Sequence, residues 1–452
     1  MEKVRHLGEE RVMKHILRYS TPAIAGMVIY GLNRIVGNIF IGKFLGQSAM
    51  AGFTVANSLV MINLGFIMLV GTGSSALISI FLGKKETGRA QATLGTAITL
   101  GFALSFAITA IGEAFTAPLL RVFGGEGESL AYGAEFITVY LLGNVFQFWN
   151  TTFNSAMRAE GQPGKALLTN VVSFIANTVL TPVFIFVIPM GMRGIAMANI
   201  ISQCIVALWL CGHFFGKKTI LPLVPRAFIP DLSLTVRMVS IGIAPFFMQF
   251  LGASMSIVTN HIVRNLAGDL GLAVAGAVFS VYFLLIMPLQ GTSVGIQPII
   301  GYNFGAALHH RVRKTVIASI AFTACICVVE ASLAIAFRSR LGGLFTNGDQ
   351  GLVALCSQGL LLILLAFPIA GIQFVGSSLF LGTGKSLYAL IVNLFRSLFV
   401  LIPILLLPGL MGITGLFLSY PATDVVVSVL CVLLMRDVMA RQKGAARVPA
   451  GQ

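Results

Sequence analysis

The sequence predicts an all-α membrane protein whose twelve transmembrane helices form two six-helix lobes related by a pseudo-two-fold axis. Three observations lead to this fold class: the composition, the spacing of the apolar runs and an internal repeat. Of the 452 residues, 57% are hydrophobic and 10% are charged, and the mean hydropathy is +0.92, whereas soluble domains carry roughly 25% charged residues. A bilayer explains the deficit, because lipid replaces water around most of the surface.

Twelve apolar segments are long enough to cross a bilayer, which takes about 20 residues of helix. Their centres lie near residues 32, 66, 103, 144, 176, 203, 251, 288, 326, 366, 398 and 424. The runs through 51–83 and 270–308 are long for a single crossing. We expect each to be one tilted or kinked helix, with Pro288 and Pro298 as break points in the second.

The net charge of +15 is distributed unevenly along these segments. With the N-terminus placed inside, the inner segments hold 22 of the 30 lysines and arginines, and the outer loops hold 6. Such an excess on one side is the positive-inside pattern, which sets the orientation of a membrane protein. We therefore expect both termini in the cytoplasm, and we attribute the basic charge to orientation rather than to nucleic-acid binding.

The two halves of the chain resemble each other. GTGSSALISIFLGKK begins at Gly71 and GTSVGIQPIIGYNFGA begins at Gly291, 220 residues later. A second pair of similar segments has its lysines at Lys165 and Lys385, at the same offset. This offset spans six helices, so both copies have the same orientation in the membrane and are parallel repeats about an axis along the membrane normal.

Two proline positions extend the repeat to the first span of each half, since Pro22 and Pro245 are 223 residues apart. We expect an N-terminal lobe at 1–216, a cytoplasmic linker at 217–237 and a C-terminal lobe at 238–452. Two similar lobes that rock about a central cleft are the structural basis of alternating access.

One arginine lies near the middle of the first span. A charged side chain at that depth costs about 2.5–3.5 kcal/mol or more, so Arg34 is expected to face a cavity or a partner. Tyr30, Arg34 and Asn38 are spaced four residues apart and share one helix face. This polar stripe suits a water-filled cavity. The alternative is a structural arginine bonded to the carbonyl groups of a neighbouring helix.

Two acidic residues also lie deep in predicted spans. Asp424 is twelve residues before Arg436, near the middle of the last span, and Glu330 is sixteen residues after Lys314 in the ninth. Either carboxyl is a candidate for taking up and releasing a coupling proton, and each has a structural helix–helix contact as its alternative. Arg396 is a candidate partner of Asp424.

Uncharged polar residues complete the candidate cavity walls. Asn150 and Asn154 are four residues apart in the fourth span, Asn177 and Thr181 lie in the fifth, and Asn260 and His261 lie in the seventh. Arg396 in the eleventh span is a further candidate for the cavity wall. A membrane-embedded transferase would need a compact cluster of acids or histidines at one interface, but the fifteen acids are scattered. We therefore expect a protein that is not an enzyme.

The order and spacing of several motifs resemble one transporter family. These motifs are FIG after the first span, RAEGQP at 158–163, NTVLTP at 177–182, QPIIGYNFGA at 297–306 and NLFRSLFVLIP at 393–403. Together they are similar to the multidrug and toxic compound extrusion (MATE) transporters, most of all to the bacterial small-drug exporters.

The resemblance implies inward-facing and outward-facing states of two lobes, and export of drug-like compounds driven by inward flow of H⁺ or Na⁺. It also implies a monomer in the bacterial inner (plasma) membrane with no cofactor beyond the coupling ion, no nucleic-acid partner and small-molecule substrates.

The chain departs from the family pattern in the N-terminal lobe. Many members have acids where this chain has Gly37 and Thr181, whereas Asn154 and Asn177 match the polar residues of the family. Without those carboxylates the lobe has no group at these positions that exchanges a proton. We therefore expect the coupling cation at Asp424 and Glu330.

Arg34 then has two hypothetical roles: a fixed charge in place of the coupling cation, or a contact with an anionic group of the substrate. The alternative function is a flippase for a lipid-linked precursor, in which Arg34 and Arg396 would hold a pyrophosphate.

Overall fold

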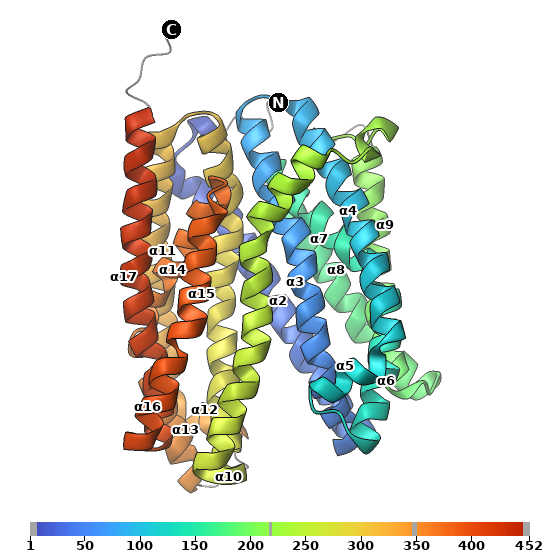
Figure 1. Cartoon of the computed structure of the whole chain (residues 1–452), viewed down its shortest axis with the longest axis vertical. Coiled ribbons are helices and arrows are strands. Elements are labelled where there is room, and N and C mark those ends of the chain that lie inside the picture. Colours follow the sequence, from blue (N-terminus) through green and yellow to red (C-terminus); the bar gives the residue numbers. More distant parts are fainter. Residues whose placement is uncertain (1–6, 217–218, 346–349, 446–452) are drawn as a thin grey trace. The chain divides into compact units, whose positions relative to one another are not determined.

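The computed structural model describes residues 7–216, 219–345 and 350–445, and this part of the chain is almost entirely helical (Figure 1). The helices up to the middle of the chain are α2 (Val12–Phe40), α3 (Gln47–Gly83), α4 (Thr87–Ala114), α5 (Thr116–Val122), α6 (Gly127–Leu142), α7 (Asn144–Ala159), α8 (Pro163–Pro182) and α9 (Gly191–Phe215). The later helices are α10 (Leu232–Gly305), α11 (His309–Ala336), α12 (Arg338–Phe345), α13 (Gln350–Ile363), α14 (Phe367–Gly382), α15 (Ser386–Phe399), α16 (Leu401–Met411) and α17 (Ile413–Ala445). Short π-helical turns at Ile41–Leu45 and Val183–Val187 extend α2 and α8, and a 3-10 turn, η3 (Pro225–Phe228), precedes α10.

Twelve membrane spans contain the long helices of the described ranges, and the short helices α5 and α12 lie between spans. Ten helices are each long and apolar enough to cross a bilayer. Two more spans are bent pairs: α6 with α7 at 54°, and α13 with α14 at 51°. Each span contains one of the twelve predicted centres, so the predicted fold class is confirmed.

The longest helical run, α10, contains two of these spans, Leu232–Gly252 and Val274–Gly305. The chain breaks at Gly268, whose φ of 60° and ψ of −152° lie in a region that glycine adopts without steric cost. Pro288 and Pro298, predicted as break points, both lie within continuous helix. Neighbouring helices accommodate proline in membrane helices.

The chain forms two compact units that differ from the predicted lobes. The N-terminal unit is made mainly of Ala25–Phe250, and the C-terminal unit of Glu10–Ile24 and the chain from Leu251 onward. The start of α10 thus belongs with the N-terminal unit, and the start of α2 with the C-terminal unit. The predicted boundaries, 1–216, 217–237 and 238–452, place both of these segments in the other lobe.

Glycines of the two repeated motifs explain this division. In the N-terminal unit, the backbone of Met238 on α10 lies so close to Gly73 on α3 that a side chain at Gly73 would overlap it. In the C-terminal unit, a Cβ at Gly291 would lie 2.5 Å from Cα of Ile24, and one at Gly295 would lie 2.7 Å from Cα of Ser20. Glycine alone permits backbones to approach this closely.

Gly242 on α10 tests the close contact inside the N-terminal unit. A Cβ there would lie 2.6 Å from Cα of Leu69, whereas Gly252, ten residues later on the same helix, has open space around it. We expect Gly242→Val to lower the unfolding free energy by about 1–3 kcal/mol, since backbone cannot move as freely as a side chain. Thermal unfolding in detergent should show a lower Tm for Gly242→Val than for Gly252→Val. Equal Tm values would contradict the close contact.

Candidate functional site

The principal candidate site is a group of side chains in the C-terminal unit, here called the C-terminal polar cluster. It comes from four helices that lie together in this unit (Figure 1). Its members are Tyr282 (α10), Gln373 (α14), Arg396 (α15), and Tyr420, Asp424 and Ser428 (α17).

Asp424 is at the centre of this cluster and only 1% of its surface is exposed. Its Oδ1 accepts hydrogen bonds from Nη2 of Arg396 at 3.2 Å and from Nε2 of Gln373 at 3.3 Å. Its Oδ2 accepts a longer one from the hydroxyl of Tyr282, at 3.4 Å. The carboxylate is therefore both neutralised by a charge and bonded on each oxygen, which a buried charge requires.

Helical spacing explains how α17 contributes to this site. Tyr420, Asp424 and Ser428 are four residues apart, so they share a face of the helix. Gln373 of α14 bridges along that face, because its Nε2 also donates to Oγ of Ser428 at 3.2 Å and to the carbonyl oxygen of Asp424 at 3.2 Å. Aromatic rings enclose the group, with Tyr282 and Tyr420 edge to face at 6.0 Å.

This arrangement confirms the predicted pairing of Arg396 with Asp424. The Asp424 carboxylate thus joins α17 to side chains of three other helices, Arg396, Gln373 and Tyr282.

The remaining predicted residues of the C-terminal unit are not part of the cluster. Glu330 lies on α11 and is half-buried, and its Oε2 is enclosed without a hydrogen bond from the described part of the chain. Its neighbour Cys327 on the same face packs against Gly371 of α14. His261 is exposed on α10. The side chain of Asn260 lies outside the described residues.

The predicted polar stripe of the N-terminal unit lies on α2. The side chain of Tyr30 is 50% exposed, and those of Arg34 and Asn38 are partly buried. Tyr30 is within electrostatic range of both Arg34 and Tyr140 of α6. Tyr140 in turn donates to Oε1 of Gln147 at 2.8 Å. The stripe therefore belongs to a larger polar region of this unit.

The predicted asparagines of α7 are bonded to neighbouring helices. Asn150 donates to Gln203 of α9. Asn154 is buried and donates to Oγ1 of Thr169 at 2.7 Å and to the carbonyl oxygen of Ala166 at 2.9 Å, both on α8. Its own Oδ1 accepts from Arg158. These contacts hold α7, α8 and α9 together, so both asparagines have structural partners.

Thr181, where many family members are expected to have an acid, and the predicted polar residue Asn177 both lie on α8. Thr181 is 2% exposed and donates to the carbonyl oxygen of Asn177 at 2.8 Å, within α8. Asn177 is buried as well. The hydroxyl of Thr181 is therefore satisfied inside its own helix and supplies no charge.

Several polar residues of the two units were not predicted from the sequence as site residues. In the N-terminal unit, Asn63 of α3 donates to Asn144 of α7 at 3.0 Å, beside Tyr140 and Gln147. In the C-terminal cluster, Tyr282 and Gln373 were missed because single uncharged residues in apolar runs carry little signal. The spacing of Tyr420 and Ser428 on either side of Asp424 was a usable signal for that face of α17.

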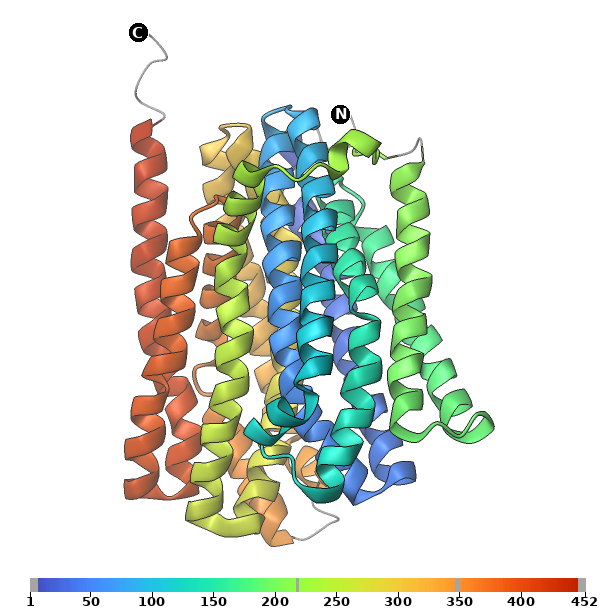
Figure 2. The same ribbon diagram turned by 45° about the vertical axis from the view of Figure 1, so that its right-hand side comes forward.

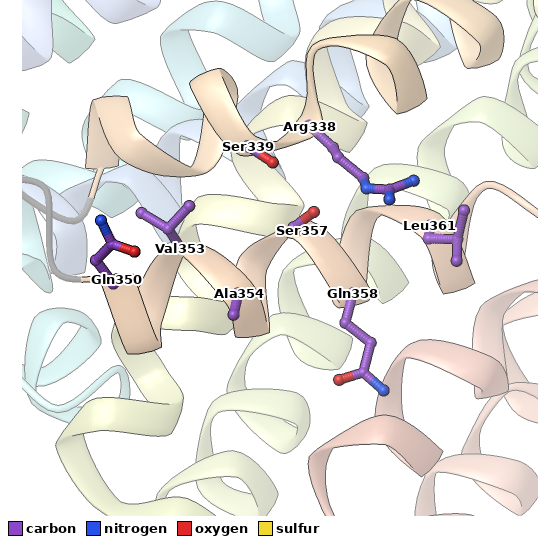
Figure 3. Close-up of a pocket in the computed structure, with 8 residues that line it drawn as sticks. All are labelled: Arg338, Ser339, Gln350, Val353, Ala354, Ser357, Gln358 and Leu361. Carbon is purple, nitrogen blue, oxygen red and sulfur yellow. The ribbon is translucent and has the colours of Figure 1, made fainter.

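A pocket of about 680 Å³ lies elsewhere in the C-terminal unit, between α12 and α13 (Figure 3). Its lining consists of Arg338, Ser339, Gln350, Val353, Ala354, Ser357, Gln358 and Leu361. Figure 3 shows Arg338 and Ser339 on one helix facing Ser357 on the other. Its lining includes none of the predicted site residues. In the described ranges, no three His, Cys, Asp or Glu side chains meet as a metal site.

A family comparison identifies the fold and both repeats. The sequence model of the MatE family matches residues 22–183 and, a second time, residues 245–406. The two matches begin at Pro22 and Pro245, the prolines that the internal repeat pairs. The chain belongs to the MATE transporter family.

Curated MATE relatives are similar along the whole chain. The multidrug export protein MepA of Staphylococcus aureus (strain NCTC 8325 / PS 47) is 24% identical over 439 residues, covering 96% of this chain and 97% of MepA. MepA of Staphylococcus saprophyticus is 24% identical over 443 residues, with the same coverage.

Solved MATE structures have the same fold. An outward-facing multidrug resistance MATE transporter has a TM-score of 0.93 at 21% identity, covering 98% of this chain and 99% of that one. A transporter of the MOP superfamily from Pyrococcus furiosus has a TM-score of 0.91 at 21% identity, covering 97% and 98%. The two-lobe, twelve-helix fold of the MATE family is therefore that of this chain.

The Arg396–Asp424 pair should show energetic coupling. Arg396→Met leaves a carboxylate buried without its counter-charge. We expect a loss of about 1–3 kcal/mol in unfolding free energy, less than the roughly 3–5 kcal/mol for a fully buried pair, because the Arg396 side chain is 30% exposed. The double variant Arg396→Met/Asp424→Leu should lose less than the two single variants combined. Thermal unfolding of all four proteins measures this, and additive losses would refute the coupling.

Proposed function

We propose that this protein is a secondary active multidrug exporter that moves small amphipathic organic compounds out of the cell while H⁺ or Na⁺ flows in. Family membership and the multidrug export relatives along the full chain support export. The single observation that supports cation coupling is the C-terminal polar cluster, in which an almost fully buried carboxylate is held by side chains of three other helices.

Coupling at Asp424 follows from what protonation does there. A ligand shifts a conformational equilibrium only through a difference in its affinity for the two states. A proton on Asp424 removes the charge that Arg396 pairs with and weakens the acceptor for Tyr282 and Gln373. A conformation in which Asp424 makes these hydrogen bonds therefore becomes less stable than a conformation in which it does not. Na⁺ could exert a similar effect by displacing Arg396.

Glu330 is the second proposed coupling residue. Its partly buried carboxyl lies on α11, which packs against α14, the helix that provides Gln373. Gly37 and Thr181 leave the N-terminal unit without the two acids at which many relatives are expected to bind the cation. We therefore assign coupling to the C-terminal unit, with no cofactor other than the transported ion.

Orientation and mechanism complete the proposal. An even number of spans places both termini on one side of the plasma membrane, and the excess of lysine and arginine on that side indicates the cytoplasm. Rocking of the two repeats between inward-facing and outward-facing states would alternate access to the substrate. We propose a monomer as the functional unit.

Arg34 is proposed to contact an anionic group of some substrates. Its stripe on α2 includes the half-exposed Tyr30 and lies beside Tyr140. The P. furiosus transporter is described as having a binding pocket of reverse polarity, which suggests a different function for it, so pocket polarity varies on this fold. Lipid-linked precursors are the alternative substrate, but the relatives are named for multidrug export.

Transport by reconstituted protein tests the coupling site. Proteoliposomes with an imposed H⁺ or Na⁺ gradient should export a fluorescent drug, and Asp424→Asn should reduce gradient-driven export by about tenfold or more, since the uncharged amide can neither take up the proton nor pair with Arg396. Asp437→Asn is the matched control: Asp437 lies on the same helix and also has an arginine and a tyrosine as partners, Arg441 and Tyr388. Undiminished gradient dependence in Asp424→Asn would refute coupling at this residue.

A comparison of the export of anionic and cationic dyes tests the role of Arg34. We expect Arg34→Ala to reduce export of a dye that carries a carboxylate by about tenfold, the size of one charge-assisted contact, and to leave export of a cationic dye equal or faster. Arg34→Lys keeps the charge and should retain part of the anionic export. Unchanged export of both dyes in Arg34→Ala would remove the proposed contact.

A further inference from the structure

A fully buried carboxylate lies at the end of α7, outside the C-terminal polar cluster. Glu160 follows the last residue of that helix and is 0% exposed. It sits in a tight turn, because Gly161 has a φ of +87° and α8 begins at Pro163. No step of the proposed transport cycle uses this residue, yet it is buried as completely as any group in the core.

The partners of Glu160 come from a distant part of the sequence. Its Oε1 accepts hydrogen bonds from the backbone N–H of Ile220 at 2.9 Å and of Leu221 at 2.8 Å, and from the hydroxyl of Thr219. Its Oε2 lies 3.4 Å from the donating Nε2 of Gln162 and 3.6 Å from Nε2 of His213 on α9. A carboxylate that accepts several N–H and O–H donors makes hydrogen bonds about twice as strong as neutral ones.

The three donors to Oε1 belong to the segment that joins the two repeats. The segment then runs beside α4 of the N-terminal unit. In Figure 2 it is the stretch of chain that crosses α4 just before α10 begins. Gln91 donates to the carbonyl oxygen of Pro222 at 2.8 Å, and Thr99 donates to that of Phe228 at 3.0 Å. The backbone of Ala227 packs against Gly95, where a side chain would overlap it.

The segment then enters α10 without leaving the N-terminal unit. Asp231 caps α10 by accepting from the backbone N–H of Ser233 at 2.8 Å, and the next turns of α10 pack on the glycine-bearing face of α3. Residues 219–231 are thus bound at one end by Glu160 and from Pro222 to Asp231 by α4, and α3 packs against the start of α10 that follows. The sequence predicted a linker here, but its contacts are those of an integral part of one unit.

We propose that Glu160 is a positioning residue that fixes residues 219–231 to the N-terminal unit, so that the chain joining the repeats moves with that unit during transport and does not act as a flexible linker. The carboxylate provides the amides of Ile220 and Leu221 with one negatively charged acceptor, Oε1. An alanine there leaves the amide of Ile220 without this acceptor and that of Leu221 with only Oγ1 of Thr219, and an enclosed donor that loses its partner is costly.

Hydrogen exchange of the intact protein tests the contact directly. In Glu160→Ala, exchange in peptides covering residues 219–223 should accelerate by about tenfold or more, as expected for the loss of charge-assisted bonds. Glu160→Gln retains an acceptor oxygen without the charge and should give a smaller acceleration. Glu86→Ala is the matched control, because Glu86 is a partly exposed carboxylate whose ion pair with Arg89 is local, and it should leave these peptides unchanged.

Transport gives the second readout and depends on the proposed function. We expect Glu160→Ala to lower turnover about fivefold or more per folded molecule, with the KM for the drug within about twofold of the wild-type value, and Glu160→Gln to restore part of the turnover. A merely structural role would lower Tm and yield while the folded fraction kept its turnover.

Two results would overturn the proposal: unchanged exchange at 219–223 in Glu160→Ala, or wild-type turnover in that variant despite faster exchange. If Glu160→Ala does not fold, the same two comparisons with Glu160→Gln decide. A wild-type protein that exports no drug would refute the proposed function, while the exchange experiment would still test the contact.

Discussion

A carboxylate that leaves water must find donors for both of its oxygens, and two residues of this chain meet that requirement in opposite ways. Asp424 lies within the membrane and is satisfied by side chains from three other helices. Glu160 lies at the end of a span and is satisfied mainly by backbone amides. Side-chain donors can rotate away, whereas backbone amides are fixed by the fold. The proposed coupling site and the proposed attachment of residues 219–231 therefore follow from the same constraint.

The two repeats share a backbone plan and differ in chemistry. Both are matched by one family model. In the C-terminal unit, Asp424 is buried inside a membrane span and accepts hydrogen bonds from side chains of three other helices. In the N-terminal unit, Thr181 and Asn177 are bonded to each other within α8, and the asparagines of α7 bond neighbouring helices. The same backbone fold thus carries interhelical hydrogen bonds of uncharged side chains in one repeat and a buried ion pair in the other.

The fold was largely predictable because the cost of polar backbone in lipid makes each span a long apolar run. The pairing of Arg396 with Asp424 was predictable for the same reason, since two opposite charges at one depth are costly apart. Tyr282 and Gln373 were not predictable, because an uncharged polar residue in an apolar run is equally compatible with a hydrogen bond to a neighbouring backbone. A break between the spans centred near 251 and 288 was predicted, but its residue, Gly268, was not, because a single positive φ leaves no compositional trace.

The boundaries of the two units could not be predicted from the sequence, because they depend on which helix backbones pack against each other. Gly73 admits the start of α10, and Gly291 and Gly295 admit the start of α2. The first helical turns of each half of the chain therefore belong to the unit that is made mainly by the other half. Domain-swapped dimers exchange segments in the same way. If the chain arose by duplication, its ancestor would have been a pair of six-helix subunits that exchanged these ends. A single half made alone would leave Gly73, or Gly291 and Gly295, without the backbone that packs against them, so separately produced halves should be stable only when they are made together.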